Sequence, residues 1–215
     1  MGGRGIGSGR RGNTGGGDQR FGSLKPLPLA GQTAFDRNGR NLGTQASIDK
    51  WETKNATLDH EQLLMVNSDG YAVAYFDGDK DSVAFAIPRG VDASDITLTH
   101  VHPAYYDRDI GGTFSEADLV NHIRLGLKET RAVSVEGTYV FRAEKGANPR
   151  AFLRALARRG SDTSSAINKA VKAKEKSLGR KLTEKEYSKI FLDAHDRWLK
   201  THATGHGYYY KLEKN

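Results

Sequence analysis

Hydrophobic and polar positions alternate in short runs through the centre of the chain. Residues 61–88, EQLLMVNSDGYAVAYFDGDKDSVAFAIP, contain three apolar runs separated by SDG and DGDKD. Asp, Ser, Asn and Gly favour tight turns, so the segment predicts an antiparallel meander. The aspartates of the second turn, Asp77, Asp79 and Asp81, are expected to lie in solvent where the hairpin reverses.

The next strand is predicted at DITLTHVHP, residues 95–103. Successive residues of a strand point to opposite faces, so one face carries Ile96, Leu98, His100 and His102, and the other carries Thr97, Thr99 and Val101. An apolar row therefore ends in two imidazoles. Pro103 stops the strand and opens a loop beside them.

The pattern then changes to helical spacing and back. SEADLVNHIRLGL, residues 115–127, predicts a helix, and RAVSVEGTYVF, residues 131–141, predicts a hairpin that turns at Glu136 and Gly137. The expected fold class is therefore α/β, in the α+β sense, with a mixed sheet and flanking helices.

Helical signals dominate after Lys145. Asn148 and Pro149 are expected to begin a helix that Gly160 ends, and a second helix should run from Asp162 to Leu178 with Gly179 as its stop. Thr183 and Glu186 form a capping box for a third helix. Its predicted apolar stripe comprises Tyr187, Ile190, Phe191, Ala194 and Trp198. The last residues, THATGHGYYYKLEK, suggest a helix end and an extended aromatic tail that packs on the core or on a partner.

The first residues have a different composition. MGGRGIGSGRRGNTGGGDQRFG is mostly Gly, Arg and Ser, and such a segment cannot bury enough apolar surface to become ordered. The predicted organisation is a flexible tail and linker over residues 1–45, a core over 46–145 and a helical appendage over 146–215. The basic tail could anchor nucleic acid or a partner, or it could be a spacer.

Composition limits the available chemistry. The chain has 33 Lys and Arg against 26 Asp and Glu, a net charge of +7, which favours acidic partners such as nucleic acid. It has no cysteine, which excludes disulfides, thiolate ligands and thiol nucleophiles. No stretch approaches the length of a membrane span and the start has no apolar signal region, so we expect a cytoplasmic protein.

The two histidines predict a metal site. Residues i and i+2 of a strand lie roughly 6.6 Å apart on one face, so His100 and His102 can reach one zinc ion. A catalytic zinc commonly has three protein ligands, and Asp118, in the first turn of the following helix, is the best third candidate. Ser115 and Asp118 also have the spacing of a helix capping box, and a histidine pair can be simply a half-buried polar patch. The box still leaves Ser115 and backbone N–H groups near the ion, where an oxyanion could be stabilised.

HVHP followed by SEAD resembles the JAMM (JAB/MPN) metalloprotease motif, H-x-H-P and then S-x-x-D, and the preceding meander resembles the RadC-type branch. The resemblance covers residues 58–143. It implies a JAB/MPN-like sheet, zinc held by His100, His102 and Asp118, an oxyanion contact from Ser115, and Glu61 as the general acid and base. A fainter similarity to small phage proteins suggests a phage or prophage origin.

One departure from the family lies in the loop. Pro103 to Phe114 separate His102 from Ser115 by 12 residues, where the family usually has about 7. The extra segment, Tyr105 to Asp109, is expected to be an exposed loop or a lid over a substrate. Asp107 and Asp109 are alternative carboxylate ligands.

The resemblance implies a zinc-dependent hydrolase of peptide or isopeptide bonds acting on a protein or peptide substrate. The alternative is a non-catalytic phage structural, assembly or interaction module with a JAMM-like core, whose partners would be phage structural proteins and whose location could be the virion. A magnesium nuclease is disfavoured, because that metal requires a carboxylate cluster.

Overall fold

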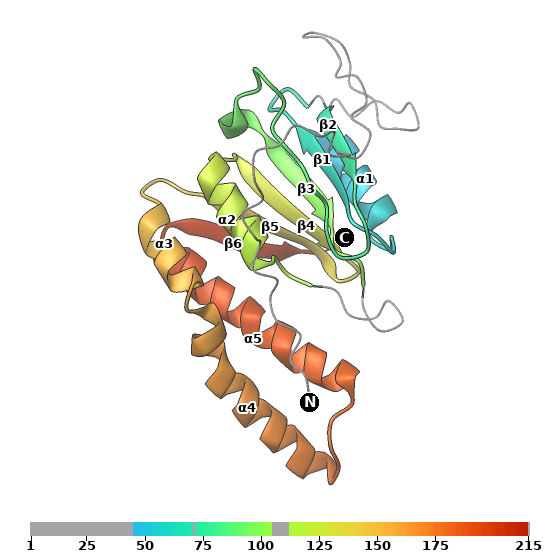
Figure 1. Ribbon diagram of the computed structural model, residues 1–215, viewed down its shortest axis with the longest axis vertical. Coiled ribbons are helices and arrows are strands. Elements are labelled where there is room, and N and C mark those ends of the chain that lie inside the picture. The colour runs from blue at the N-terminus through green and yellow to red at the C-terminus, as the bar shows by residue number, and fades with distance from the viewer. Residues whose placement is uncertain (1–44, 71, 105–111, 215) are drawn as a thin grey trace, which may run out of the picture.

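A computed structural model describes residues 45–70, 72–104 and 112–214, and within them the fold is mixed α/β (Figure 1). The strands are β1 (Gln62–Val66), β2 (Ala72–Asp77), β3 (Thr97–Val101), β4 (Glu129–Ser134), β5 (Gly137–Ala143) and β6 (Tyr208–Glu213). The helices are α1 (Gln45–Asn55), α2 (Glu116–Leu125), α3 (Pro149–Leu156), α4 (Arg159–Leu178) and α5 (Glu184–Gly205), with a 3-10 turn at Ala93–Asp95. The predictions made for the Gly/Arg-rich tail and for Tyr105 to Asp109 concern residues outside this description.

The described strands form one sheet in the order β2-β1-β3-β4-β5-β6. Neighbours are antiparallel except β3 and β4, which are parallel. Parallel neighbours require a crossover, and α2 supplies it. The chain leaves the carboxyl end of β3 and enters the N-terminus of α2, so these two ends come together at one edge of the sheet. Ligands commonly bind at such an edge in α/β sheets.

Both faces of the sheet are covered by helices. On one face α1 packs Ile48 and Trp51 against Leu64, Val101 and Val133. On the other face α2, α3 and α5 pack around an aromatic core. This core includes Phe114, Leu119, Phe141, Phe152, Trp198 and Tyr208. The alternation predicted for residues 96–101 is confirmed, because Thr99 and Val101 face α1 while Leu98 and His100 face the α2 side.

The third apolar run of the predicted meander is not a strand. Within the described part of the chain residues 83–87 belong to no strand, although Val83, Phe85 and Ile87 still pack against the hydrophobic cluster around Leu63 and Leu98. Alternating hydrophobicity specifies which side chains face the core. It does not specify whether the backbone joins a sheet edge or, as here, crosses over the sheet face.

One predicted helix boundary was also wrong. Gly160 does not end a helix: α3 ends at Leu156, and Gly160 lies in the first turn of α4. A C-terminal glycine stops a helix by adopting positive φ, which Gly160 does not do. Gly179 does so with φ of 66° and ends α4 as predicted. The Thr183 capping box is also confirmed at the start of α5.

The aromatic C-terminus is part of the sheet. β6 pairs with β5, and Tyr208 and Tyr210 are buried in the aromatic core. A Cβ at Gly137 would collide with the carbonyl oxygen of Glu213, so the close approach of β6 requires glycine there. The boundary predicted between residues 145 and 146 thus runs through a shared sheet and core.

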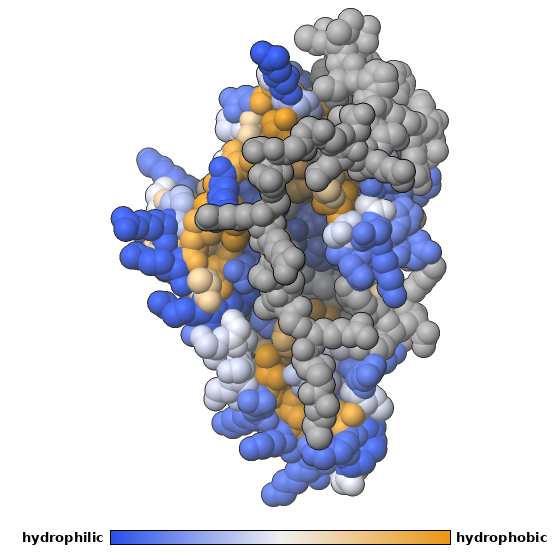
Figure 2. Space-filling model, in the orientation of Figure 1, coloured by the Kyte–Doolittle hydropathy of each residue, from blue (hydrophilic) through white to orange (hydrophobic). Residues whose placement is uncertain are grey.

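The long helices α4 and α5 form a hairpin that extends away from the sheet (Figure 1). Hydrophobic surface gathers over α2 and between α4 and α5 on the face shown in Figure 2. The predicted stripe of α5 is only partly covered, since Ala194 and Trp198 are buried while Tyr187 and Phe191 are 47% and 41% exposed. No helix in the described part of the chain is both long and apolar enough to cross a membrane.

Helix α1, which the sequence pattern did not predict, carries a buried acidic residue. Glu52 is 2% exposed and accepts hydrogen bonds from Arg131 at 2.7 and 2.9 Å and from the Thr99 hydroxyl at 2.8 Å. Arg131 also bonds Glu129 at 3.1 Å. This network fixes α1 to the centre of the sheet.

We therefore expect Glu52→Gln to lower the free energy of unfolding by about 2 kcal/mol, because it removes the buried charge that accepts two hydrogen bonds from Arg131 and leaves Glu129 and Glu213 as the acidic partners of that guanidinium. Chemical denaturation monitored by circular dichroism measures this. Glu144→Gln, which alters an exposed carboxylate, is the control. An effect of Glu52→Gln no larger than that of the control would contradict a structural role for the pair.

Candidate metal centre

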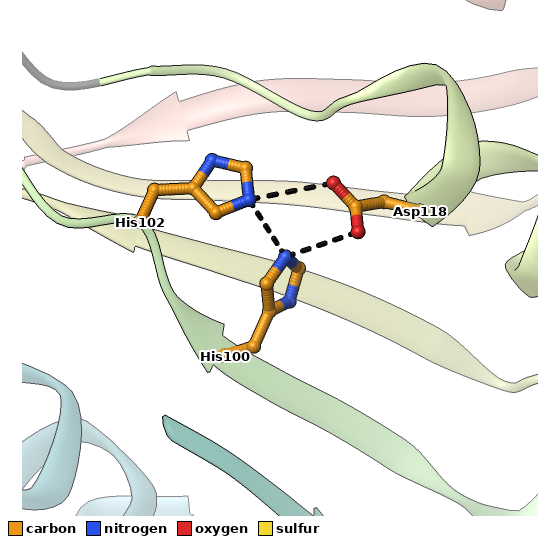
Figure 3. Close-up of side chains that lie close together, drawn as sticks. All are labelled: His100, His102 and Asp118. Atoms are coloured by element: carbon orange, nitrogen blue, oxygen red, sulfur yellow. Dashed lines mark hydrogen bonds and ion pairs between the residues drawn. The ribbon is translucent and has the colours of Figure 1, made fainter. Parts of the chain in front are cut away.

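His100, His102 and Asp118 meet at the edge of the sheet where β3 ends and α2 begins (Figure 3). His100 lies on β3, and His102 follows its last residue, with its N–H bonded to the Val133 carbonyl on β4. Asp118 is in the first turn of α2. The β3–α2 crossover is therefore what brings the predicted ligands together.

The three side chains lie close enough to share one metal ion, since one donor atom from each lies within 4.8 Å of the others. Asp118 lies 3.3 Å from His100 Nε2 through Oδ1 and 3.4 Å from His102 Nε2 through Oδ2. Two ligands bound to zinc at about 2.0 to 2.1 Å with a tetrahedral angle lie roughly 3.3 Å apart. The two Nε2 atoms are 2.9 Å apart, so this pair would open by a few tenths of an ångström. The partly buried cluster could bind a metal ion.

Surrounding hydrogen bonds orient two of the three side chains. The Gly112 carbonyl oxygen lies 3.2 Å from His102 Nδ1, a contact that requires a proton on Nδ1 and so makes Nε2 the nitrogen that a metal ion would bind. Asp118 Oδ2 accepts the Ser115 N–H at 2.7 Å, and Ser115 Oγ accepts the Asp118 N–H at 3.2 Å. The predicted capping box is confirmed, and it holds the Asp118 carboxylate toward the histidines. His100 Nδ1 is buried and has no hydrogen-bond partner among the residues that the structure describes.

Asp118 and His102 each favour the charged form of the other. Burial acts to raise the pKa of Asp118, but the charges and hydrogen bonds of His100 and His102 hold that pKa well below its ordinary value. Burial acts to lower the pKa of His102, but Asp118 and then Glu61 raise it above its ordinary value. Asp118 is thus anionic at neutral pH, which is the state that a cation requires.

Glu61 lies directly before β1 and lines the same cleft as the three candidate ligands. Leu63 is opposite His100 in the β1–β3 ladder, and continuing that register by two residues places Glu61 opposite His102 on the same face. Burial raises the pKa of Glu61, an effect that His102 and His100 oppose. A carboxylate with a raised pKa beside a metal site suits proton transfer.

The cluster opens into a cleft of about 390 Å³ whose walls come from distant parts of the chain. Val83 and Phe85 of the extended segment form part of it. Arg159, Phe191, Leu192 and His195 of the C-terminal helices form another part. The sequence pattern did not assign these four residues to the site: Phe191 was predicted only as part of the apolar stripe of α5, and no local signal marked Arg159, Leu192 or His195.

Three other candidate residues, Asp79, Asp81 and His122, lie outside the ligand cluster. Asp79 caps its exposed turn by accepting the N–H groups of Asp81 and Ser82, in agreement with the solvated turn expected there. Asp81 lines the rim of the cleft. His122, four residues after Asp118, is 2% exposed and bonds the Thr130 hydroxyl at 2.9 Å.

No family model matches the chain, and no curated protein or solved structure matches it. The case for the metal centre therefore stands on the geometry and chemistry of these residues.

The purified protein should bind about one divalent ion per chain, because three converging ligands are present. His100→Ala and Asp118→Ala should each remove it, as measured by elemental mass spectrometry and zinc titration. His206→Ala, which alters a histidine outside the cluster, should leave the stoichiometry unchanged. Full metal content in both ligand variants would place the ion elsewhere.

His122 should make the fold sensitive to acid. Burial lowers its pKa from 6.5 to about 4, so as the pH falls through this window the unfolded chain takes up a proton that the folded chain does not. The free energy of unfolding should decrease between pH 6.5 and 4 by up to about 1.4 kcal/mol per pH unit from this residue. His122→Gln should make the pH dependence shallower by that amount in denaturation curves, and an unchanged slope would exclude His122 as a source.

Proposed function

We propose that the chain is a zinc-dependent hydrolase that cleaves a peptide or isopeptide bond. The observation that carries the proposal is that His100, His102 and Asp118 converge in a cleft that Glu61 also lines. Two imidazoles and one carboxylate are a donor set that suits zinc and leaves a fourth position for water. The resemblance of HVHP and SEAD to the JAMM motif supports the same class.

Glu61 is the proposed general base and acid. Zinc, when bound, would lower the pKa of a water ligand and polarise the substrate carbonyl. Glu61 takes the proton from this water and returns it to the leaving amine. Its raised pKa supports both halves of this transfer, because a stronger base accepts the proton more readily and remains a usable acid near neutral pH.

Ser115 is the proposed oxyanion donor. Its Oγ accepts the Asp118 N–H, so the hydroxyl proton is not used by the helix cap and can be donated to the substrate. Ser115 lines the cleft beside Asp118. A donor of this kind stabilises the oxygen that becomes negative when the carbonyl is attacked, and its removal typically slows catalysis by about 100-fold to 1,000-fold.

A non-catalytic interaction module is the second candidate. The observation in its favour is the protruding α4–α5 hairpin, which exposes Leu178 and Tyr187. In this case the metal would stabilise the core, and the partners would be proteins such as phage structural components.

The Glu61→Gln variant distinguishes the hydrolase from the non-catalytic module. We expect this variant to keep its zinc and to lose hydrolysis by about 100-fold or more, because general acid–base catalysis contributes at least that much. Peptides and lysine-linked isopeptides are the substrates, and cleavage is followed by mass spectrometry. Glu116→Gln is the control, because Glu116 is exposed near Asp118 but does not line the cleft. Zinc binding with no cleavage by the wild type would favour the non-catalytic module.

A further inference from the structure

Helices α4 and α5 add a wall to the metal cleft that lies outside residues 58–143, where the metalloprotease resemblance is found. Arg159 begins α4, and Phe191, Leu192 and His195 follow one side of α5. This wall faces the same space as the candidate ligands. It is therefore in position to select what reaches them.

Arg159 is the one lysine or arginine among the described residues that line the cleft. Its Nη1 donates to the Phe114 carbonyl at 3.3 Å, which ties the guanidinium to the loop just before Ser115. Within the described part of the chain no carboxylate forms an ion pair with Arg159. Guanidinium carries five N–H donors in a planar fork, so most of its hydrogen-bonding capacity remains available toward the cleft.

The surroundings leave this cation incompletely neutralised. Burial lowers the pKa of Arg159, while Glu116 and Asp118 act in the opposite direction through their charges. Asp118 is already engaged by His100 and His102, and a divalent ion there would neutralise it further. His195 adds no charge at neutral pH, since burial and then Arg159 lower its pKa to about 4. A partly desolvated arginine in this position favours an incoming anion.

We propose that Arg159 binds a carboxylate of the substrate, so that the cleft selects peptides carrying a free carboxylate close to the bond presented to the metal centre. A guanidinium can donate two parallel hydrogen bonds to one carboxylate, which fixes the orientation of the bound group. The carboxylate is either the C-terminus of the peptide or an Asp or Glu side chain. The inference rests on the proposed function for the identity of the substrate as a peptide.

The rest of the cleft indicates a hydrophobic neighbour to that carboxylate. Leu63, Val83, Phe85, Leu98, Leu127 and Phe191 contribute apolar surface. Phe191 is 41% exposed, so a bound apolar side chain would remove it from water. The preferred ligand is thus an apolar residue beside an acidic group.

Binding to zinc-loaded, full-length Glu61→Gln tests the proposal without turnover. Fluorescence anisotropy compares matched hexapeptide pools that end in a free carboxylate or an amide, and pools that contain Asp and Glu or Asn and Gln. One of the acidic pools should bind about tenfold more tightly than its neutral partner, which identifies the source of the carboxylate. Equal binding of acidic and neutral pools in both pairs would overturn the proposal.

Variants of Arg159 test whether this residue causes the preference for acidic peptides. Adding Arg159→Gln should reduce the acidic preference to less than about twofold, and Arg159→Lys should retain part of it, because lysine keeps the charge but not the fork. Arg158→Gln is the matched control: it removes the same charge one residue away, from an exposed side chain that does not line the cleft. If Arg159→Gln does not fold, the Lys variant and the pool comparison decide the question. Loss of preference in the Arg158 variant as well would reduce the effect to nonspecific charge.

The two proposals fail in different ways. Cleavage of neutral and acidic peptides at equal rates by the wild type, with equal binding, would leave the hydrolase standing and overturn the role of Arg159. Acidic preference that depends on Arg159, in a protein that binds zinc but cleaves no peptide, would leave the anion site standing and overturn the hydrolase.

Discussion

The capping box at the start of α2 is the interaction on which the candidate metal centre depends. Ser115 and Asp118 exchange hydrogen bonds across the first turn, which starts the helix and fixes the Asp118 carboxylate in the same step. The parallel pairing of β3 with β4 requires the crossover that places this turn beside His100 and His102. The position of the Asp118 carboxylate is therefore set both by the local capping box and by the crossover between β3 and β4.

The opposite face of the same strand shows how the position of β3 is maintained. His100 points to the metal side, while Thr99 points to α1 and donates to Glu52. Glu52 in turn binds Arg131 on the neighbouring strand β4. This buried network joins helix α1 to strands β3 and β4. These two strands set the spacing between the histidines and the crossover helix. The geometry of the candidate ligands thus depends on polar contacts on the opposite face of the sheet, where α1 packs.

The C-terminal segment completes the sheet and the aromatic core, and it also lines the cleft. β6 extends the sheet, and α3 and the end of α5 fill the aromatic core, so the start of α4 is held firmly against the loop that precedes Ser115. That attachment is what brings Arg159 to the cleft. The apolar stripe of α5 has two uses in consequence: Trp198 packs in the core, and Phe191 remains partly open at the cleft.

Local patterns in the sequence were sufficient for the parts of the protein that depend on near neighbours. The alternation around His100, the spacing of Ser115 and Asp118, and the Gly179 stop each follow from the geometry of one strand or one helix end. For the same reason the convergence of His100, His102 and Asp118 was predictable, since all three lie within 19 residues on one strand–loop–helix unit.

Tertiary structure decided everything that joins distant segments. No local pattern indicates that Glu52 pairs with Arg131, that residues 83–87 cross the sheet face instead of extending its edge, or that Tyr208 to Glu213 complete the sheet. No local pattern indicates either that Arg159 lines the cleft of the candidate metal ligands. Hydrophobic periodicity states that a surface must be covered, but which segment covers it depends on the packing of the whole chain.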